Sequence, residues 1–177
     1  LPYIQQAALA LDYMHSKKLI HRDVKPENML LQTDGAVLLS DFGIASAVHT
    51  TATLTDPGCA GTPPYMAPEQ IQHRPCPASD QYALAVIVYK WLTGRRPFQG
   101  TGWALFEQHI STPPPALRNF LPTIPSALEA TVLKALAKNP QQRFPTIQAF
   151  AQALKHVNQV DQVVKITPVS PPVTNTQ

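Results

Sequence analysis

The feature that most constrains the fold is an apolar run, Tyr82–Leu92, interrupted only by Lys90. A helix needs about 20 consecutive apolar residues to cross a bilayer, so this run is too short for a membrane span. No other apolar run in the sequence is longer. We therefore predict that the run forms a buried helix.

Hydrophobic periodicity predicts further helices around it. Ile4, Ala8, Leu11 and Met14 share one helical face, so residues 3–16 are predicted to form an amphipathic helix. Helical patterns recur at about 80–93, 101–111, 125–138 and 145–157, with Ser126 and Thr146 as candidate caps of the last two. The chain has 177 residues, which is enough for one domain with a sizeable core.

Two short apolar runs, Met29–Leu31 and Val37–Leu39, flank Asp34-Gly35 and predict a β-hairpin. With a two-residue turn at Asp34-Gly35, Asn28 and Asp41 would be directly opposite, with their Cβ atoms about 5 Å apart. An amide oxygen and a carboxylate at one end of a ribbon form a hard oxygen site suited to Mg²⁺ held jointly with phosphate. Asp23 is close enough in sequence to lie beside that site.

Aperiodic segments divide the chain. Residues 44–64 are rich in Thr, Ala and Gly and predict a long loop, and such loops are usually functional or mobile. The 19 prolines mostly lie between the periodic segments. We predict a folded unit over 1–157 and a Pro-, Thr- and Val-rich linker or disordered tail over 158–177.

Charge and cysteine usage exclude several classes of function. The formal net charge is +3, and the Lys17–Lys18 and Arg95–Arg96 pairs are better explained as solvated surface than as a nucleic-acid interface. Cys59 and Cys76 lack metal-ligand spacing and are interpreted as free thiols in a reducing compartment. With no signal peptide or transmembrane run apparent, we expect a cytoplasmic location.

Three motifs occur in order: His21–Asn28 (HRDVKPEN), Asp41–Gly43 (DFG) and Ala67–Glu69 (APE). Each is weak alone, but their order and spacing resemble the signature set of protein kinases. The resemblance covers roughly residues 3–157 and implies the C-terminal lobe of that fold, a mainly helical α+β lobe with one short β-hairpin. Lys25 and the segment Gly61–Glu69 resemble the serine/threonine class, and Gly61–Gln70 resembles bacterial eukaryotic-like (Hanks-type) kinases.

The resemblance implies a role for each matching residue. Asp23 is implied as the catalytic base, Lys25 as the cation near the transferring phosphate, and Asn28 and Asp41 as ligands of Mg²⁺. Thr62 would hydrogen-bond near Asp23 and Lys25. The implied reaction transfers the γ-phosphate of ATP to Ser or Thr hydroxyls of protein substrates.

Other matches imply structural roles. Leu30 would form the floor of the adenine pocket and is expected to be buried. His21 and Phe42 would belong to a packed column, and Glu69 and Arg143 to a buried ion pair. Asp80 would hold the backbone of the catalytic loop, although an aspartate at that point could also be a helix N-cap.

Arg22 precedes the implied base, and in similar kinases this arginine binds a phosphate on the activation loop. Residues 44–61 would form that loop. A Thr-rich composition is also typical of a plain flexible loop. The candidate phosphorylation sites are Thr50, Thr51, Thr53 and Thr55.

Parts of the kinase signature do not occur in this sequence. There is no Gly-x-Gly-x-x-Gly loop and no Val-Ala-Ile-Lys strand, so an N-lobe would be needed in cis or in trans for full activity. Three interpretations follow: a fragment of an active kinase, which the retained catalytic residues favour; a non-catalytic, pseudokinase-like interaction module; or a chain completed by a separate N-lobe. The tail at 158–177 is compatible with the juxtamembrane linker of a membrane-anchored parent and equally with a plain C-terminus.

Overall fold

The computed structural model of the chain describes residues 2–41 and 62–166, with side chains described as far as residue 157. The described elements are mainly helical, with a single two-stranded antiparallel sheet, which confirms the predicted fold class. The helices are α1 (Pro2–Ser16), α2 (Pro68–Ile71), α3 (Pro77–Thr93), α4 (Gly102–Ser111), α5 (Ser126–Ala135) and α6 (Ile147–Ile166). Short 3₁₀ turns are η1 (Pro26–Asn28), η3 (Pro63–Tyr65), η4 (Leu117–Asn119) and η5 (Pro140–Gln142).

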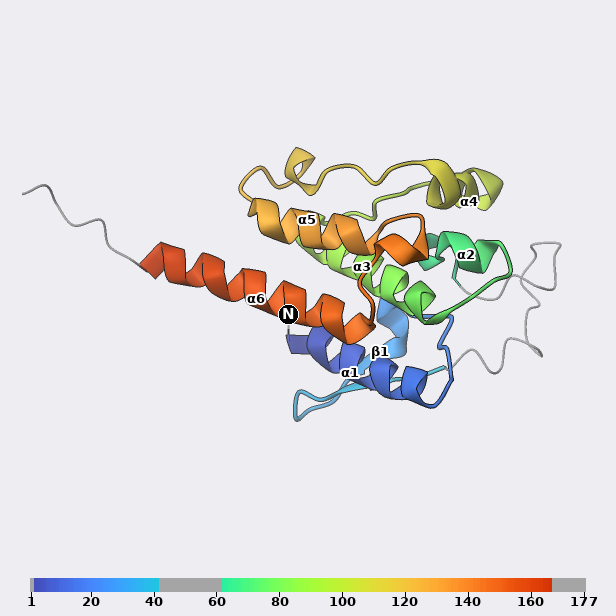
Figure 1. Cartoon of the computed structure of the whole chain (residues 1–177), viewed down its shortest axis with the longest axis horizontal. Helices are drawn as coiled ribbons and strands as arrows, with labels where there is room; N and C mark the ends of the chain where they lie inside the picture. Colours follow the sequence, from blue (N-terminus) through green and yellow to red (C-terminus); the bar gives the residue numbers. More distant parts are fainter. Residues whose placement is uncertain (1, 42–61, 167–177) are drawn as a thin grey trace, which may run out of the picture.

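Helix α3 contains the apolar run and is buried, as predicted, and it lies at the centre of the packing. It contacts α1, α2, α5 and α6, and every residue from Tyr82 to Tyr89 is buried. Figure 1 shows α3 between α5 on one side and α1 on the other, with α6 running along α1. This helix carries a buried aspartate, Asp80, near its N-terminal end, which matters for the site below.

Helix α1 confirms the amphipathic pattern, because Ile4, Ala8, Leu11 and Met14 are all buried. The outer face of α1 holds the hairpin. The Gln6 side chain accepts from the backbone N of Val37 (2.8 Å) and donates to the carbonyl O of Gly35 (3.2 Å). Polar contacts from a helix therefore determine where the hairpin lies.

The predicted hairpin is present as β1 (Met29–Leu31) and β2 (Val37–Leu39), but the predicted register is wrong by one residue. Met29 pairs with Leu39 and Leu31 with Val37, so the loop has three residues at its tip rather than two. Gly35 donates to Gln32 O (3.0 Å) and has a φ of 85°, which a glycine adopts without strain. This extra loop residue places Ser40, not Asp41, opposite Asn28, with Ser40 N donating to Asn28 O at 3.0 Å.

Helix ends differ from the periodicity in informative ways. Thr146 caps α6 as predicted, because its Oγ1 accepts from Ala149 N (3.0 Å). Ser126 does not cap α5, since the carbonyl of Pro125 already accepts from Leu128 N and Ser126 is the first helical residue. Helix α6 continues to Ile166 rather than ending near residue 157. Among the helices of 2–41 and 62–166, none is both long and apolar enough to cross a membrane.

Candidate active site

The loop between α1 and η1 is held by Asp80 from helix α3. The Asp80 carboxylate accepts from the backbone N of His21 (3.0 Å) and of Arg22 (2.9 Å). Arg22 has a φ of 67°, an uncommon left-handed conformation for a residue with a side chain, and the two hydrogen bonds support it. The role expected of Asp80, holding this loop, is therefore seen in its contacts.

The alternative expectation, that Asp80 is the N-cap of the buried helix, is wrong. Helix α3 begins at Pro77, and the N-cap is Cys76, whose backbone N donates to Ser79 Oγ (3.1 Å). Asp80 lies one turn inside the helix, where its backbone N–H no longer needs a cap. Cys76 is a free thiol, as predicted, whereas Cys59 lies outside the described residues.

The sequence did not reveal two further supports of this loop. His15, in the last turn of α1, lies with its Nε2 2.7 Å from Asp80 Oδ2. Gln70, from α2, donates from Nε2 to the carbonyl O of Arg22 at 2.6 Å. A polar residue at a helix end or in a buried short helix carries no sequence signal for such a partner, because the partners are more than 40 positions away.

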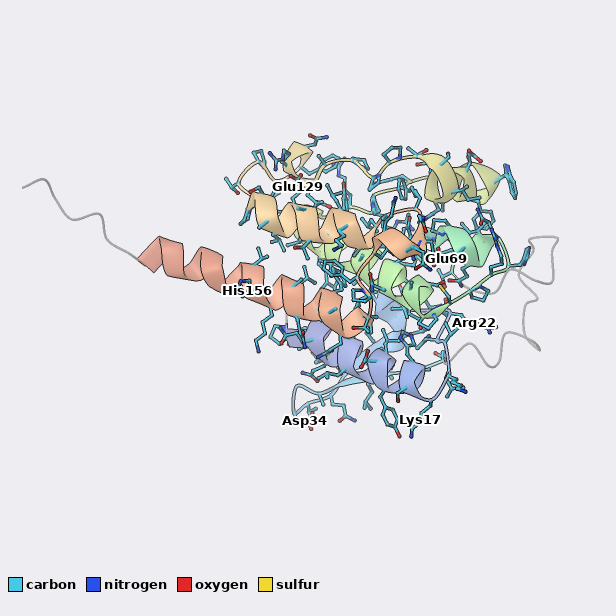
Figure 2. All side chains as sticks on the ribbon, in the orientation of Figure 1. Lys17, Arg22, Asp34, Glu69, Glu129 and His156 are labelled. Atoms are coloured by element: carbon cyan, nitrogen blue, oxygen red, sulfur yellow. The ribbon has the colours of Figure 1, made fainter. Side chains whose placement is uncertain are left out.

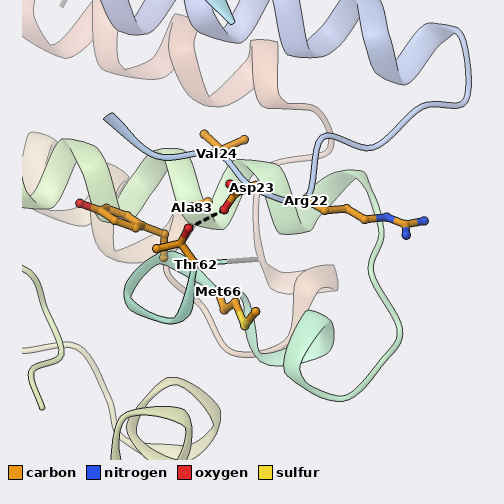
Figure 3. A pocket seen from close by; sticks show the side chains of 7 residues that line it. Arg22, Asp23, Val24, Thr62, Met66 and Ala83 are labelled. Carbon is orange, nitrogen blue, oxygen red and sulfur yellow. Dashed lines mark hydrogen bonds between the residues drawn. The ribbon is translucent and has the colours of Figure 1, made fainter. Parts of the chain in front are cut away.

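The loop brings Asp23, Lys25 and Thr62 into mutual contact. Thr62 Oγ1 donates to Asp23 Oδ1 at 2.6 Å, and Lys25 Nζ donates to Thr62 Oγ1 at 2.9 Å. Lys25 Nζ also lies 2.7 Å from Asp23 Oδ2. Figure 3 shows the Asp23–Thr62 hydrogen bond facing a small pocket, with the Arg22 side chain directed away from it. The expected position of Thr62 beside both residues is thus confirmed by geometry.

These contacts determine the charge state of Asp23. Burial raises the pKa of the carboxyl group, but hydrogen bonds from Lys25, Thr62 and Asn28, together with the charge of Lys25, outweigh burial and lower the pKa below its ordinary value. Asp23 is therefore a carboxylate at neutral pH, with its oxygens held in fixed directions. It can orient a hydroxyl group and receive its proton.

Asn28 lies opposite Ser40 at the open end of the hairpin, and Asp41 is the next residue after Ser40. Asn28 is buried, and its Nδ2 donates to Asp23 O (2.9 Å) and Asp23 Oδ2 (3.1 Å). That orientation leaves Oδ1 as the available acceptor of the amide, and no described residue donates to it. Asp41 is exposed, has a φ of 56°, and accepts a long hydrogen bond from Ser40 Oγ (3.3 Å). Two oxygen donors of this kind fit a hard cation such as Mg²⁺ that is shared with phosphate.

Several other predicted residues can be placed, and some cannot. Leu30 is 50% exposed, so the expectation that it is buried is wrong for this chain. It lies in the middle of β1, on a two-stranded ribbon, and pairs with Leu38 of β2. His21 is buried, and its Nδ1 accepts from Asp23 N (3.4 Å). Phe42 and the predicted phosphorylation sites lie outside the described residues: Thr50, Thr51, Thr53 and Thr55.

Glu69 and Arg143 form the buried ion pair that the resemblance implied. The guanidinium contacts both carboxylate oxygens, Nη1 to Oε1 at 2.7 Å and Nη2 to Oε2 at 2.8 Å. The two residues are 7% and 4% exposed, and Figure 2 shows Glu69 among the helices, in contrast to Lys17 at the periphery. The pair joins α2, which follows Thr62, to the segment between α5 and α6.

Residues 2–157 match the protein kinase domain family. The chain is 41% identical over 160 residues to the serine/threonine-protein kinase PknA of Mycobacterium tuberculosis, a match that covers 89% of this chain and 36% of PknA. It is also 41% identical over 159 residues to Pkn1 of Myxococcus xanthus, covering 86% of this chain and 23% of that kinase.

A solved structure also resembles this chain. The kinase domain of Mycobacterium tuberculosis PknI superimposes with a TM-score of 0.65 and 32% sequence identity. The match covers 88% of this chain and 52% of the PknI kinase domain. The chain therefore spans about half of a solved kinase domain and about a third or less of its similar full-length relatives.

Proposed function

Because the chain belongs to the protein kinase family, as a bacterial Hanks-type serine/threonine member, we propose that it transfers the γ-phosphoryl group of ATP to Ser or Thr hydroxyls of proteins. The observation that carries the proposal is the three-way contact of Asp23, Lys25 and Thr62. It joins the carboxylate of Asp23 and the hydroxyl group of Thr62, which both line one small pocket, to the cation of Lys25.

In the proposed reaction, the substrate hydroxyl oxygen forms a bond to the γ-phosphorus as the bond between that phosphorus and the β,γ-bridging oxygen breaks. ADP leaves with the bridging oxygen, and the hydroxyl proton passes to the Asp23 carboxylate. Lys25 contacts Asp23 and Thr62, two residues that line the pocket, so its charge can offset the negative charge of the phosphoryl group. Thr62 holds Asp23 Oδ1 in a fixed direction.

Asn28 and Asp41 are proposed as the protein ligands of Mg²⁺. Bound to ATP, the ion would neutralise phosphate charge. The Asn28 amide is held by its two hydrogen bonds to Asp23, so the metal ligand and the base are mechanically joined. Since ATP is a cytoplasmic metabolite, we place the reaction in the cytoplasm.

The chain supplies the base and the oxygen donors, and we propose that an N-lobe, in cis or in trans, supplies the rest of the nucleotide site. Phosphoryl transfer depends mostly on positioning and electrostatics, so half of a nucleotide clamp should give weak activity. The exposed Leu30 is consistent with a surface that a further lobe would cover.

The test is phosphotransfer from labelled ATP to two Ser- and Thr-containing protein substrates, one acidic and one basic, with Asp23→Asn as the variant. Asp34→Asn is the matched control, because Asp34 is an exposed aspartate in the hairpin loop that accepts from Ala36 N (2.9 Å). We expect activity to be lost in Asp23→Asn and kept in Asp34→Asn, first in the chain alone and then with a kinase N-lobe added. Absence of phosphotransfer even with an added N-lobe would refute the proposal and favour a pseudokinase-like interaction module.

A further inference from the structure

A second polar cavity of about 510 Å³ lies at the C-terminal end of α3, away from Asp23. Its lining residues are Lys90, Gly94, Arg95, Arg96 and Gln99, and we call it the basic cavity. Three of the five carry a positive charge and none carries a negative one. The sequence predicts that Arg95–Arg96 are solvated surface. The structure adds Lys90, from the last turn of α3, to the same cavity.

The cations of the basic cavity have no carboxylate partner among the described residues. Lys90 Nζ donates to the hydroxyl group of Tyr65 (3.4 Å), which is neutral. The Arg95 guanidinium lies 4.6 Å from the centre of the Phe120 ring. Arg96 is close enough to buried His109 to act on it: burial, Lys138 and then Arg96 lower the pKa of His109 to about 3. The described surroundings thus leave an uncompensated positive field.

The backbone that carries these cations is well held. Gly94 ends α3 in the left-handed conformation (φ 76°), and its N donates to Lys90 O at 2.8 Å. Thr93 Oγ1 donates to Arg95 O at 2.9 Å. A cation on an ordered backbone loses less conformational freedom when a ligand binds, which favours specific binding over a diffuse surface attraction.

Tyr65 connects the basic cavity to the catalytic pocket. It belongs to η3, which begins directly after Thr62, and it lines the pocket that contains Asp23 and Thr62. Its hydroxyl group reaches Lys90 on the other side. A peptide whose hydroxyl group is at Asp23 therefore has the basic cavity within reach of a side chain a few residues along.

We propose that the basic cavity binds an anionic side chain, a carboxylate or a phosphate, on the protein substrate near the residue that is phosphorylated. This inference rests on the proposed kinase function and adds a substrate class to it. Arginine forms paired, charge-assisted hydrogen bonds with either group. A Lys or Arg at the same substrate position would meet three like charges, so the cavity selects by repulsion as well as by attraction.

The test measures binding and does not depend on catalysis. Fluorescent peptides with one Ser and either Asp/Glu, phosphoserine, neutral or Lys/Arg flanks are titrated with the 177-residue chain, and affinity is read by anisotropy at two salt concentrations. We expect the anionic peptides to bind on the order of tenfold more tightly than the neutral one, and the basic peptide more weakly. The preference should shrink at high salt. Comparing the Asp/Glu and phosphoserine peptides identifies which anion is preferred.

Two variants locate the effect. Lys90→Glu and Arg96→Gln should remove the preference for anionic peptides, with Lys90→Glu shifting it toward basic ones. Lys155→Glu is the matched control: it makes the same charge change on an exposed face of α6 and should leave the preference intact. Circular dichroism checks that each variant is folded.

Equal affinity for anionic and basic peptides would overturn the inference, as would an equal loss of preference in Lys155→Glu. Neither result would affect the proposed phosphotransfer, which is measured separately with Asp23→Asn. Conversely, selective binding of anionic peptides without any phosphotransfer would support the basic cavity and count against the proposed reaction.

Discussion

Removal of the Arg143 guanidinium is the perturbation for which the structure gives the clearest magnitude. Arg143→Met would keep much of the aliphatic volume but leave the Glu69 carboxylate buried, with the Ser79 hydroxyl (2.8 Å) as its remaining strong donor. The change also removes the donors to the carbonyl oxygens of Ala78 (2.8 Å) and Ala137 (2.8 Å). Breaking a buried ion pair on one side typically costs about 3–5 kcal/mol.

We expect a loss of that size in the free energy of unfolding, which is a large part of the total for a domain of marginal stability. For a chain of this size, the loss corresponds to a fall in Tm of roughly 6–20 °C. Urea unfolding followed by the fluorescence of Trp91 and Trp103 measures the free energy, and a thermal melt measures Tm. Both tryptophans are exposed (48% and 74%), so their emission is also sensitive to local changes, and circular dichroism should be recorded in parallel.

The matched control is Arg74→Met, because the Arg74 side chain is exposed and donates to the side chain of Gln72 (2.6 Å). We expect that change to cost less than about 0.5 kcal/mol. The double variant Glu69→Leu/Arg143→Met should recover part of the loss, since it removes the unpaired buried charge. If Arg143→Met were no more destabilising than Arg74→Met, the assignment of the pair as a stabilising buried contact would be refuted.

Three further changes test the site and the core. Lys25→Ala removes the largest contact that opposes the effect of burial on the pKa of Asp23. We therefore expect ¹³C NMR titration to find a higher Asp23 pKa than in the unmodified chain. An unchanged pKa would contradict the role of Lys25. Asp80→Asn should lower the free energy of unfolding by about 1–3 kcal/mol, because an amide offers one acceptor oxygen where the backbone N–H groups of His21 and Arg22 now use two. Hydrogen exchange at those two backbone amides is the measurement. Unaltered protection would disprove the restraint by Asp80. Burial, Lys138 and Arg96 lower the pKa of His109 to about 3 in the folded chain. As pH falls from about 6.5 toward 3, the unfolded chain therefore binds a proton that the folded chain does not. The free energy of unfolding should fall by up to about 1.4 kcal/mol per pH unit over this range. His109→Gln should flatten the slope of unfolding free energy between pH 6.5 and 5, and an identical slope in both proteins would rule out His109 as its source.

Much of the candidate active site could be predicted from the sequence, because its residues are close together along the chain. Asp23, Lys25 and Asn28 lie on one loop, so their closeness follows from chain connectivity once the loop is recognised. The buried helix could be predicted as well, because an apolar run such as Tyr82–Tyr89 has few alternatives to complete burial. The ion pair of Glu69 and Arg143 was reached by resemblance alone, since nothing in the sequence pattern joins two residues 74 positions apart.

The hairpin was predicted correctly, but its register was wrong by one residue. Asp34-Gly35 correctly predicted a turn, but a two-residue and a three-residue loop are both compatible with the same apolar runs. The left-handed Gly35 and the contacts of Gln6 on α1 selected the longer loop. A shift of one residue changes which side chain lies opposite Asn28, because neighbouring residues of a strand point to opposite faces.

What the sequence alone determined is therefore local: the loop that carries the base, the two strands, the central helix and the family. What tertiary structure decided is which distant side chains meet. His15 contacts Asp80, Leu30 is half exposed, and Lys90 joins Arg95 and Arg96 around one cavity through the way α3 ends and packs. The physical reason is that periodicity records which face of an element is apolar, whereas a polar contact across the fold depends on the relative position of two packed elements, which no single segment encodes.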